Sequence, residues 1–266
     1  MKYIFYFWNR TKSLYSYSLY QFMKKIFLYL FFLSTSLFSQ EFRVHSHNDY
    51  AQDVPFWKAF KAGCASIEAD LILKKGELYV AHNEEDIKDS HTFELLYLKP
   101  LKAVLKDDAN SMTELQLLLD IKTEAKETLK TLMLTLDKYP SLVNNKKIKF
   151  VISGNRPAPE EYKLYPSYLS FDYQTVDIWP ADWNKIALVS LPFYKYSFWN
   201  GKVVKDFDAE KFSKIIQEIH AQNKRVRFWA TPDTELAWKT FYELGIDFIN
   251  TDHPDECVKY LDGLTN

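Results

Sequence analysis

The chain has 266 residues, 47% of them hydrophobic, which is enough to bury the core of one large domain. With 34 Lys and Arg against 35 Asp and Glu, the formal net charge is −1, so there is no basic excess to neutralise nucleic-acid phosphates, and we expect no nucleic-acid partner. The two cysteines, Cys64 and Cys257, exclude a disulfide-framed fold, and the 6 Gly and 10 Pro exclude a collagen-like one.

The first 40 residues have the composition of an export signal. They hold five basic residues and no acidic one, and an apolar run, Ile26–Leu33, is followed by small and polar residues up to residue 40. This order is typical of a secretory signal peptide. We expect residues 1–40 to be that peptide, with Met23 as an alternative start, and residues 41–266 to form a single domain. The protein is then exported, either periplasmic or secreted; the alternative is an uncleaved N-terminal membrane anchor.

From residue 42 onward, short apolar runs alternate with helical patterns. Runs that are apolar without alternation suit strands buried on both faces, as in a parallel sheet. The predicted strands are Phe42–His47, Ser66–Leu71, Leu117–Ile121, Ile148–Ile152, Leu169–Asp172, Ile186–Ser190, Val226–Trp229 and Asp247–Thr251. The second strand should continue as a hairpin over Leu71–Ala81, and helix and loop are expected over Asn83–Met112. Eight strands separated by helices predict an α/β fold, the (β/α)8 barrel.

Carboxylates gather at the carboxyl ends of the second and third predicted strands, where such barrels carry their chemistry. Glu68 and Asp70 are two residues apart, so they point to the same side of the strand, and Asp120 and Lys122 repeat that spacing. Three converging carboxylates repel one another unless a cation lies between them, and Mg²⁺ or Ca²⁺ takes oxygen ligands. The alternative is a buried ion-pair cluster without function.

Histidines and aromatic residues lie near the same strand ends. His45 and His47 end the first strand and His82 ends the hairpin, so three groups that titrate near neutral pH lie beside the carboxylates. Trp229 ends the seventh strand and is the best candidate for a pocket wall. The aromatic loop 192–200 either lines a substrate pocket, touches lipid or packs against outer helices, so peripheral membrane contact is one expectation.

Four segments carry a resemblance to a known family. The segment Ser66–Asn83 resembles the Glu-x-Asp, hairpin, His pattern of glycerophosphodiester phosphodiesterases, and Leu117–Thr123 resembles their third-strand acidic-x-Lys motif. The segment Phe228–Pro254 is similar to their last two barrel strands. The opening Val44–Tyr50 resembles a divergent branch of this phospholipase-C-like superfamily, the branch named after the altered-inheritance-of-mitochondria protein.

The resemblance implies a role for each matching residue. It makes Glu68, Asp70 and Asp120 metal ligands, Lys122 the group that neutralises a phosphate oxygen, and His45 and His82 the acid/base pair. The first strand lacks the family's His-Arg-Gly, which removes a phosphate-binding arginine and leaves the choice of strand-1 histidine open. A similarity of His45-x-x-Asn48-Asp49 to sphingomyelinase-D-like relatives favours His45. The expected substrate contacts are then His47, Asn48, Asn155 and Trp229.

These observations lead to a metal-dependent phosphodiester hydrolase, related to phospholipase C and glycerophosphodiesterases. The substrate would be a phospholipid-derived or other small phosphodiester, attacked by water or by its own neighbouring hydroxyl, and the protein is expected to be a monomer. One alternative is a non-catalytic barrel that binds a sugar phosphate or a lipid head group. Another is an amidohydrolase-like metal hydrolase that uses His45-x-His47; the absence of histidine from Leu169–Asp172 and Ile186–Ser190 weighs against it.

Overall fold

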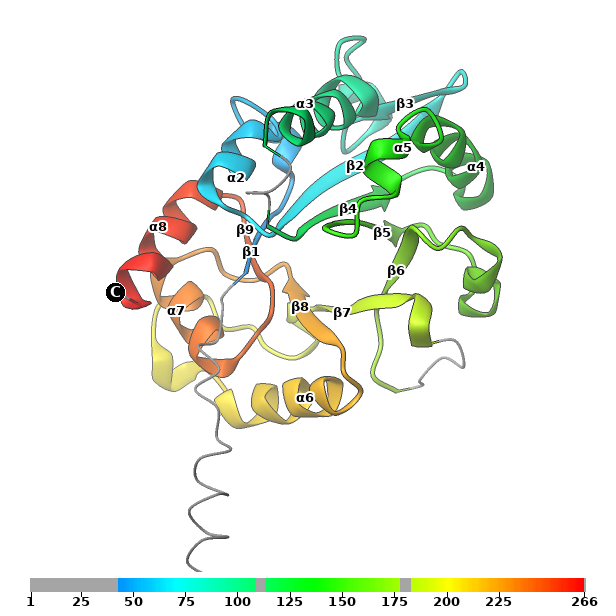
Figure 1. Cartoon of the computed structure of the whole chain (residues 1–266). Coiled ribbons are helices and arrows are strands. Elements are labelled where there is room, and N and C mark those ends of the chain that lie inside the picture. Colours follow the sequence, from blue (N-terminus) through cyan, green and yellow to red (C-terminus); the bar gives the residue numbers. More distant parts are fainter. Residues whose placement is uncertain (1–42, 109–112, 178–182, 266) are drawn as a thin grey trace, which may run out of the picture. The chain divides into compact units, whose positions relative to one another are not determined.

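The computed structural model describes residues 43–108, 113–177 and 183–265. Eight parallel strands follow one another around a ring, in the order β8-β7-β6-β5-β4-β2-β1-β9 (Figure 1). A single bridge from Arg227 of β8 to Phe248, the residue before β9, joins the two ends of this order. The nearly closed barrel confirms the predicted (β/α)8 fold.

Every predicted apolar run is a strand, and most strands differ from the prediction by a few residues at their ends. The strands are β1 (Val44–Ser46), β2 (Ser66–Lys74), β3 (Glu77–Val80), β4 (Leu115–Ile121), β5 (Ile148–Gly154), β6 (Leu169–Tyr173), β7 (Ile186–Pro192), β8 (Arg225–Trp229) and β9 (Ile249–Thr251). The predicted hairpin is confirmed, because β3 pairs antiparallel with the end of β2. Lys75 and Gly76 turn that hairpin with φ values of 52° and 81°.

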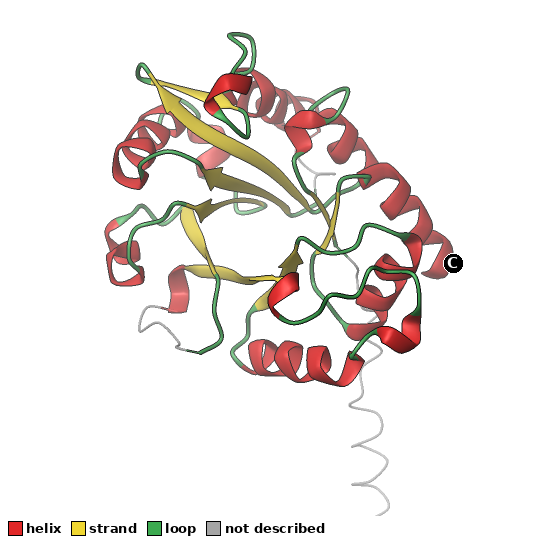
Figure 2. Cartoon of the chain, turned by 180° about the vertical axis from the view of Figure 1, so that it is seen from behind, coloured by secondary structure: helices red, strands yellow, loops and turns green. Residues whose placement is uncertain are grey.

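Helices cover the outside of the ring (Figure 2). They are α2 (Trp57–Ala62), α3 (Lys99–Asp108), α4 (Ala125–Leu136), α5 (Pro140–Val143), α6 (Ala209–Ala221), α7 (Glu235–Leu244) and α8 (Pro254–Thr265). Side-chain caps fix three of the starts: Asp208 accepts from the Lys211 N–H, Glu124 accepts from two N–H groups of α4, and Thr234 accepts from the Ala237 N–H. Gly245 ends α7 with φ 85°, a conformation that favours glycine.

Short helical turns fill several of the connections. A π-helical turn spans Glu94–Leu98, and 3₁₀ turns span Asp49–Ala51, Glu84–Asp86, Pro159–Leu164, Trp183–Lys185, Phe193–Lys195 and Val204–Asp206. Together with α3, these turns resolve the region 83–108 into helix and loop, as expected from the sequence.

The strand register places both apolar and polar side chains in the barrel interior. Leu118, Val151, Leu188 and Phe248 form a buried apolar cluster. Residues that pair in register on neighbouring parallel strands point to the same side of the sheet. The polar pairs toward the carboxyl ends are Asp70 with Asp120, Asp120 with Ser153, and Ser190 with Arg227. His45 pairs with Ser66, the first residue of β2, and with Asn250, so polar side chains also lie below the level of Leu118.

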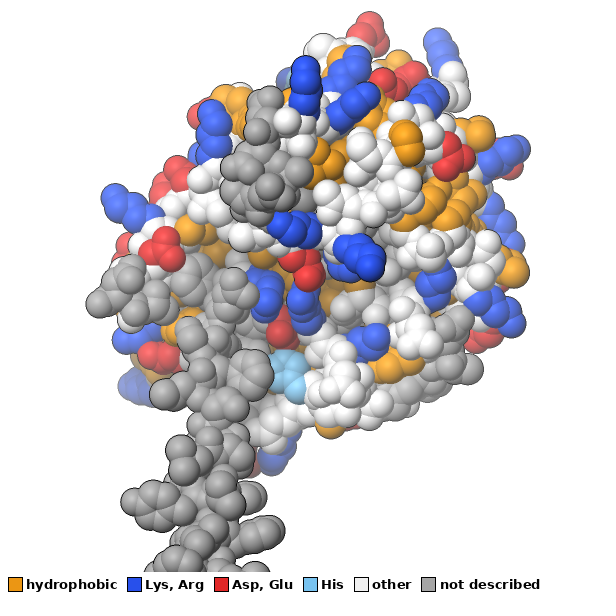
Figure 3. All heavy atoms as spheres, in the orientation of Figure 1, with side chains coloured by type: hydrophobic (Ala, Val, Ile, Leu, Met, Phe, Trp, Pro, Cys, Tyr) orange, Lys and Arg blue, Asp and Glu red, His pale blue; other side chains and the backbone are white. Residues whose placement is uncertain are grey.

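The segment 1–40 lies outside the described residues, so the signal peptide remains a prediction. Among the described residues, no helix has both the length and the hydropathy that a bilayer crossing requires. Cys64 and Cys257 are both buried and free. On the face shown in Figure 3, basic and acidic side chains lie interspersed among apolar ones.

Candidate active site

Three carboxylates from two adjacent strands converge at the carboxyl end of the barrel. Glu68 and Asp70 of β2 and Asp120 of β4 each place an oxygen within 4.8 Å of the other two. Asp70 and Asp120 are register partners, so the parallel pairing itself brings them together. The spacing fits oxygens bound to one divalent cation, which lie at most about 4–5 Å apart.

Asp70 provides an independent test of whether this cluster fits a cation. Its Oδ2 accepts hydrogen bonds from the Tyr50 hydroxyl at 2.8 Å and from His82 Nδ1 at 2.9 Å, and lies 3.0 Å from Lys122 Nζ. Its Oδ1 is buried and has no hydrogen-bond partner among the residues that the structure describes. A buried carboxylate oxygen without a partner is costly unless a ligand completes it. An oxygen-only donor set with one free buried oxygen fits a hard divalent ion, which Glu68, Asp70 and Asp120 would hold.

Lys122 provides part of the positive charge that the cluster needs. Its Nζ lies 3.0 Å from Asp70 and 3.3 Å from Asp120, and its side chain is partly exposed at the mouth. Burial, opposed by Lys122 and reinforced by the charges of Glu68 and Asp70, raises the pKa of Asp120 to about 6. One ammonium group therefore does not compensate all the negative charge gathered here.

The Glu68 carboxylate is ionised and forms an ion pair with Arg227 of β8. The guanidinium Nη1 lies 3.0 Å from Glu68 Oε2, and both side chains are buried. Burial alone would raise the pKa of Glu68, but Arg227 and the hydrogen bond from His45 hold it well below its usual range. Arg227 Nε also donates to Ser190 Oγ at 3.1 Å, which fixes the guanidinium plane.

His45 lies beneath this pair and is fully buried. Burial and the nearby Arg227, whose Nη1 also contacts the ring, lower the pKa of His45 to about 3, so the ring is neutral. Gln116 donates to Ser66 Oγ at 2.8 Å. His45 Nδ1 lies 2.7 Å from Ser66 Oγ, and His45 Nε2 lies 2.7 Å from Glu68 Oε2. Both ring nitrogens of His45 therefore have protein partners.

His47 lies at the mouth with one nitrogen held in place. Its Nδ1 donates to Asp252 Oδ1 at 2.7 Å, and the Asn48 side chain lies 3.1 Å from the same nitrogen. Burial opposes the charged ring, but the hydrogen bond with Asp252 and the charge of Glu68 outweigh it and raise the pKa of His47. With Nδ1 engaged and the side chain 29% exposed, Nε2 is the nitrogen that can exchange a proton with a ligand.

His82 follows β3 and reaches the cluster from the hairpin. Its Nδ1 lies 2.9 Å from Asp70 Oδ2, and its side chain is 60% exposed. The structure thus brings the three predicted metal ligands together with Lys122 and His82. His47 lies at the rim of the same site. Asn48 Oδ1 lies 2.9 Å from the Tyr50 hydroxyl oxygen, which places the predicted substrate contact at the same rim.

Asn155 is placed beside the site, with its amide turned to the backbone. Its Nδ2 donates to the carbonyls of Lys122 at 3.2 Å and Thr123 at 2.9 Å. It therefore fixes the turn after β4 that carries Lys122.

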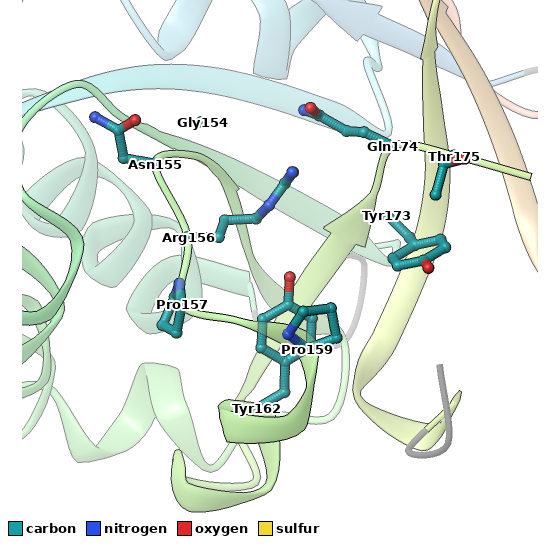
Figure 4. Close-up of a pocket in the computed structure, with 9 residues that line it drawn as sticks. All are labelled: Gly154, Asn155, Arg156, Pro157, Pro159, Tyr162, Tyr173, Gln174 and Thr175. Atoms are coloured by element: carbon teal, nitrogen blue, oxygen red, sulfur yellow. The ribbon is translucent and has the colours of Figure 1, made fainter. Parts of the chain in front are cut away.

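A cavity of about 530 Å³ opens beside Gly154 and Asn155 (Figure 4). Arg156 extends into it above the Tyr162 ring, and its Nη1 pairs with Asp172 Oδ1. Asp172 is fully buried, and its Oδ2 accepts from Ser153 Oγ at 2.9 Å and from Gln174 Nε2 at 3.3 Å. The carboxylate therefore serves to hold the guanidinium at the edge of the cluster.

On the opposite side of the ring, the turn after β8 presents polar atoms that lack partners. Trp229 Nε1 and Thr231 Oγ1 are both buried, and neither has a hydrogen-bond partner within the described part of the chain. Ala230 between them has φ 54°, a left-handed conformation that costs a residue with a side chain roughly 1–2 kcal/mol. Strain and two unpaired hydrogen-bonding groups in adjacent residues are typical of a ligand-binding turn.

Sequence reasoning missed Arg227, Arg156, Gln116 and Tyr50 as members of this site. Arg227 could have been found, because β8 alternates and Arg227 lies two residues before Trp229, on the same face. Arg156 and Gln116 carried no such signal, since Arg156 follows a strand and Gln116 lies one residue before the predicted strand Leu117–Ile121, where it pairs with Ser66 of the neighbouring β2.

The comparisons with known proteins agree with this architecture. Residues 38–116 match the family described as the AIM6-like phosphodiesterase domain, and residues 225–255 match the glycerophosphoryl diester phosphodiesterase family. Altered inheritance of mitochondria protein 6 from Eremothecium gossypii is 27% identical over 269 residues, covering 82% of this chain and 69% of that protein. Its homolog from Arthroderma benhamiae is 25% identical, covering 82% and 83%.

Solved structures share the fold at low sequence identity. A glycerophosphodiester phosphodiesterase from Parabacteroides distasonis has a TM-score of 0.57 and 15% identity, covering 84% of this chain and 98% of that one. Another from Agrobacterium tumefaciens has a TM-score of 0.50 and 13% identity, covering 84% and 100%. The resemblance predicted from the sequence is confirmed: the chain is similar in sequence to AIM6-like phosphodiesterases and shares the barrel fold of glycerophosphodiester phosphodiesterases.

Proposed function

We propose that this protein hydrolyses a phosphodiester with the help of a divalent cation held by Glu68, Asp70 and Asp120. The observation that carries the proposal is the unpartnered, buried Oδ1 of Asp70 within a cluster of three carboxylates at the barrel mouth. Lys122, His47 and His82 surround that cluster, so charge stabilisation and proton transfer are available at one place.

The charges of the site fit a singly charged substrate. Arg227 balances Glu68, and Lys122 balances one of the two charges on Asp70 and Asp120, so one negative charge is left over. A divalent cation would turn this into one positive charge, which a phosphodiester monoanion neutralises. A phosphomonoester dianion would leave the mouth negative, and burying an uncompensated charge is costly.

The bound cation, the lysine and the two histidines would each have a separate role in the reaction. A bound cation would supply Lewis-acid stabilisation of charge on a phosphoryl oxygen. Lys122 would donate to a second phosphoryl oxygen. His47 and His82 would exchange protons with the attacking and the leaving oxygen, because each presents a free ring nitrogen and is oriented by a carboxylate through its Nδ1.

We assign this proton-transfer role to His47 in place of His45. Both nitrogens of His45 are engaged by Ser66 and Glu68, and the ring is fully buried. His45 would then act as a positioning residue that orients Glu68. The cavity beside Arg156 would receive one substituent of the diester, and Trp229 and Thr231 would donate to its oxygens from the opposite side.

Steady-state hydrolysis of bis(p-nitrophenyl) phosphate and of glycerophosphodiesters tests the proposal. We expect turnover that a chelator abolishes and Mg²⁺ or Ca²⁺ restores. Lys122→Ala and His47→Ala should each lower kcat by about a hundredfold or more. Lys126→Ala is the matched control, since Lys126 pairs with Glu161 on the exposed surface. A folded, cation-binding protein that cleaves no diester would contradict the proposal and favour a binding barrel.

A further inference from the structure

A segment beside the barrel mouth exposes apolar side chains to an unusual degree. We define the mouth loop as residues 194–205, which follow β7. Phe198 in this loop is 94% exposed, Val204 55%, Tyr194 49% and Val203 41%. Single exposed apolar residues are ordinary on protein surfaces, but four within twelve residues are an unusual concentration on one loop.

The packing beneath the mouth loop holds this patch outward. Trp199, the neighbour of Phe198, is buried; its ring lies 4.7 Å from Phe207, and its Nε1 donates to the Val203 carbonyl at 2.7 Å. The Gly201 carbonyl accepts from Thr234 Oγ1 at 3.0 Å. The inward turn of Trp199 leaves Phe198 pointing away from the core, so the exposure of Phe198 is built into the fold.

The mouth loop is also basic. Lys195, Lys202 and Lys205 are exposed, and the loop holds no acidic residue. This composition stands out in a chain whose formal net charge is −1. Aromatic and aliphatic side chains interleaved with lysines fit a lipid surface, where apolar groups enter the acyl boundary and lysines meet anionic head groups.

The position of the mouth loop links it to the candidate active site. It starts at the carboxyl end of β7, and the Tyr194 ring lies 5.5 Å from Trp229, edge to face. A lipid surface bound by this loop would therefore lie beside the turn that carries Trp229 and Thr231.

We propose that the mouth loop docks the protein on an anionic lipid surface. The docking itself follows from the loop alone; its consequence, that the diester is presented in or near a lipid layer, rests on the proposed function. The apolar side chains provide affinity for the layer, and the three lysines provide preference for negative charge and sensitivity to salt.

Vesicle binding by the full chain tests this proposal. We would compare vesicles of phosphatidylcholine alone with vesicles that also contain phosphatidylserine. Phe198→Ser with Val204→Ser should lower the partition coefficient by about tenfold or more, since two apolar side chains that would enter the lipid layer are lost. Lys202→Ala with Lys205→Ala should remove most of the preference for phosphatidylserine and its dependence on salt. Leu134→Ser is the control, because Leu134 on α4 is 61% exposed but lies outside the loop.

A local probe separates the loop from other parts of the chain. Both native cysteines are buried, so Phe198→Cys can be labelled selectively with an environment-sensitive dye, and Leu134→Cys provides the matched label. The dye at position 198 should shift to the blue on phosphatidylserine vesicles, and the dye at 134 should not. Equal responses at both positions, or unchanged binding of the serine variants, would overturn the proposal. Turnover of a water-soluble diester, measured in parallel, reports on the proposed function independently.

Discussion

Gly154 lies directly against the carboxylate of Asp120. A Cβ at Gly154 would be 2.0 Å from Asp120 Oδ1 and 2.6 Å from the Ile121 carbonyl oxygen, and the backbone has φ +67°. The backbone at the end of β5 thus limits the positions that the Asp120 carboxylate can adopt. The position of one proposed cation ligand depends on the absence of a side chain on the neighbouring strand.

Gly154→Ala should therefore weaken cation binding. Gly76→Ala is the control for backbone strain, because Gly76 also has positive φ, +81°, but no described atom lies within 4 Å of its Cβ position. Backbone strain should lower the free energy of unfolding of both variants by about 1 kcal/mol. Gly154→Ala should lose more, because its Cβ also meets the Ile121 carbonyl oxygen at 2.6 Å, and only Gly154→Ala should lose cation affinity, because only there is Asp120 displaced. Calorimetry on both variants checks this, and equal cation affinities would show that Gly154 does not position Asp120.

Removing Arg227 should leave Glu68 as an uncompensated buried charge. We expect Arg227→Met to lower the free energy of unfolding by about 3–5 kcal/mol. The double variant Glu68→Gln/Arg227→Met should recover a large part of that loss, because it removes both charges. Denaturant unfolding of the two single variants and the double variant measures the coupling. Additive losses would mean that the 3.0 Å pair does not stabilise the barrel interior.

Thr231→Val should raise stability and lower activity together. The Thr231 hydroxyl is buried without a partner, so replacing it by a methyl group removes a desolvation cost of roughly 1 kcal/mol. If that hydroxyl donates to the substrate, kcat/KM should fall by about threefold to tenfold.

The control for this variant is Thr251→Val. The Thr251 hydroxyl is also buried but accepts from the His253 N–H at 2.9 Å, so its loss should destabilise the fold. A Thr231→Val protein that is less stable than the wild type, or equally active, would remove Thr231 from the proposed ligand-binding turn.

The His47–Asp252 pair should contribute to stability over a defined pH window. The pKa of His47 is raised above 6.5, so its contribution is complete below that value and is lost as the pH rises through the folded-state pKa. The pKa of Asp252 is lowered below 3.8, so its contribution is complete above that value and is lost as the pH falls through its folded-state pKa. The pair is partly exposed, so its contribution should be less than about 1 kcal/mol.

An NMR titration of the His47 ring tests this pair. Asp252→Asn should lower the pKa of His47, because the hydrogen bond that favours the charged ring is weakened. The pH dependence of turnover should move to lower pH with it. An unshifted His47 would mean that Asp252 does not control its charge.

The barrel could be predicted from the sequence because its strands are buried on both faces. The runs Leu117–Ile121 and Ile148–Ile152 are continuous and apolar, and both lie within strands in the structure. The strand ends were less predictable, since β1 has only three residues and owes its place to pairing with β2 and β9. Its end decides which of two histidines reaches the mouth.

The acidic cluster could be predicted because it depends on local spacing. The two-residue interval between Glu68 and Asp70 fixes their common face, and the same interval recurs at Asp120. The partners of these groups come from far along the chain: Arg227 lies 159 residues from Glu68, and Asp252 lies 205 residues from His47. Closure of the ring creates these contacts, and no spacing along the sequence indicates them.

Cation binding tests the central claim most directly. The measurement is a calorimetric titration of the chelator-treated protein with Mg²⁺ and with Ca²⁺, beside Asp70→Asn and, as a control, Asp177→Asn. We expect one divalent ion to bind per chain, to bind about tenfold or more weakly in Asp70→Asn, and to bind normally in Asp177→Asn. Unchanged binding in Asp70→Asn, or no binding to the folded wild type, would contradict a cation site at Glu68, Asp70 and Asp120.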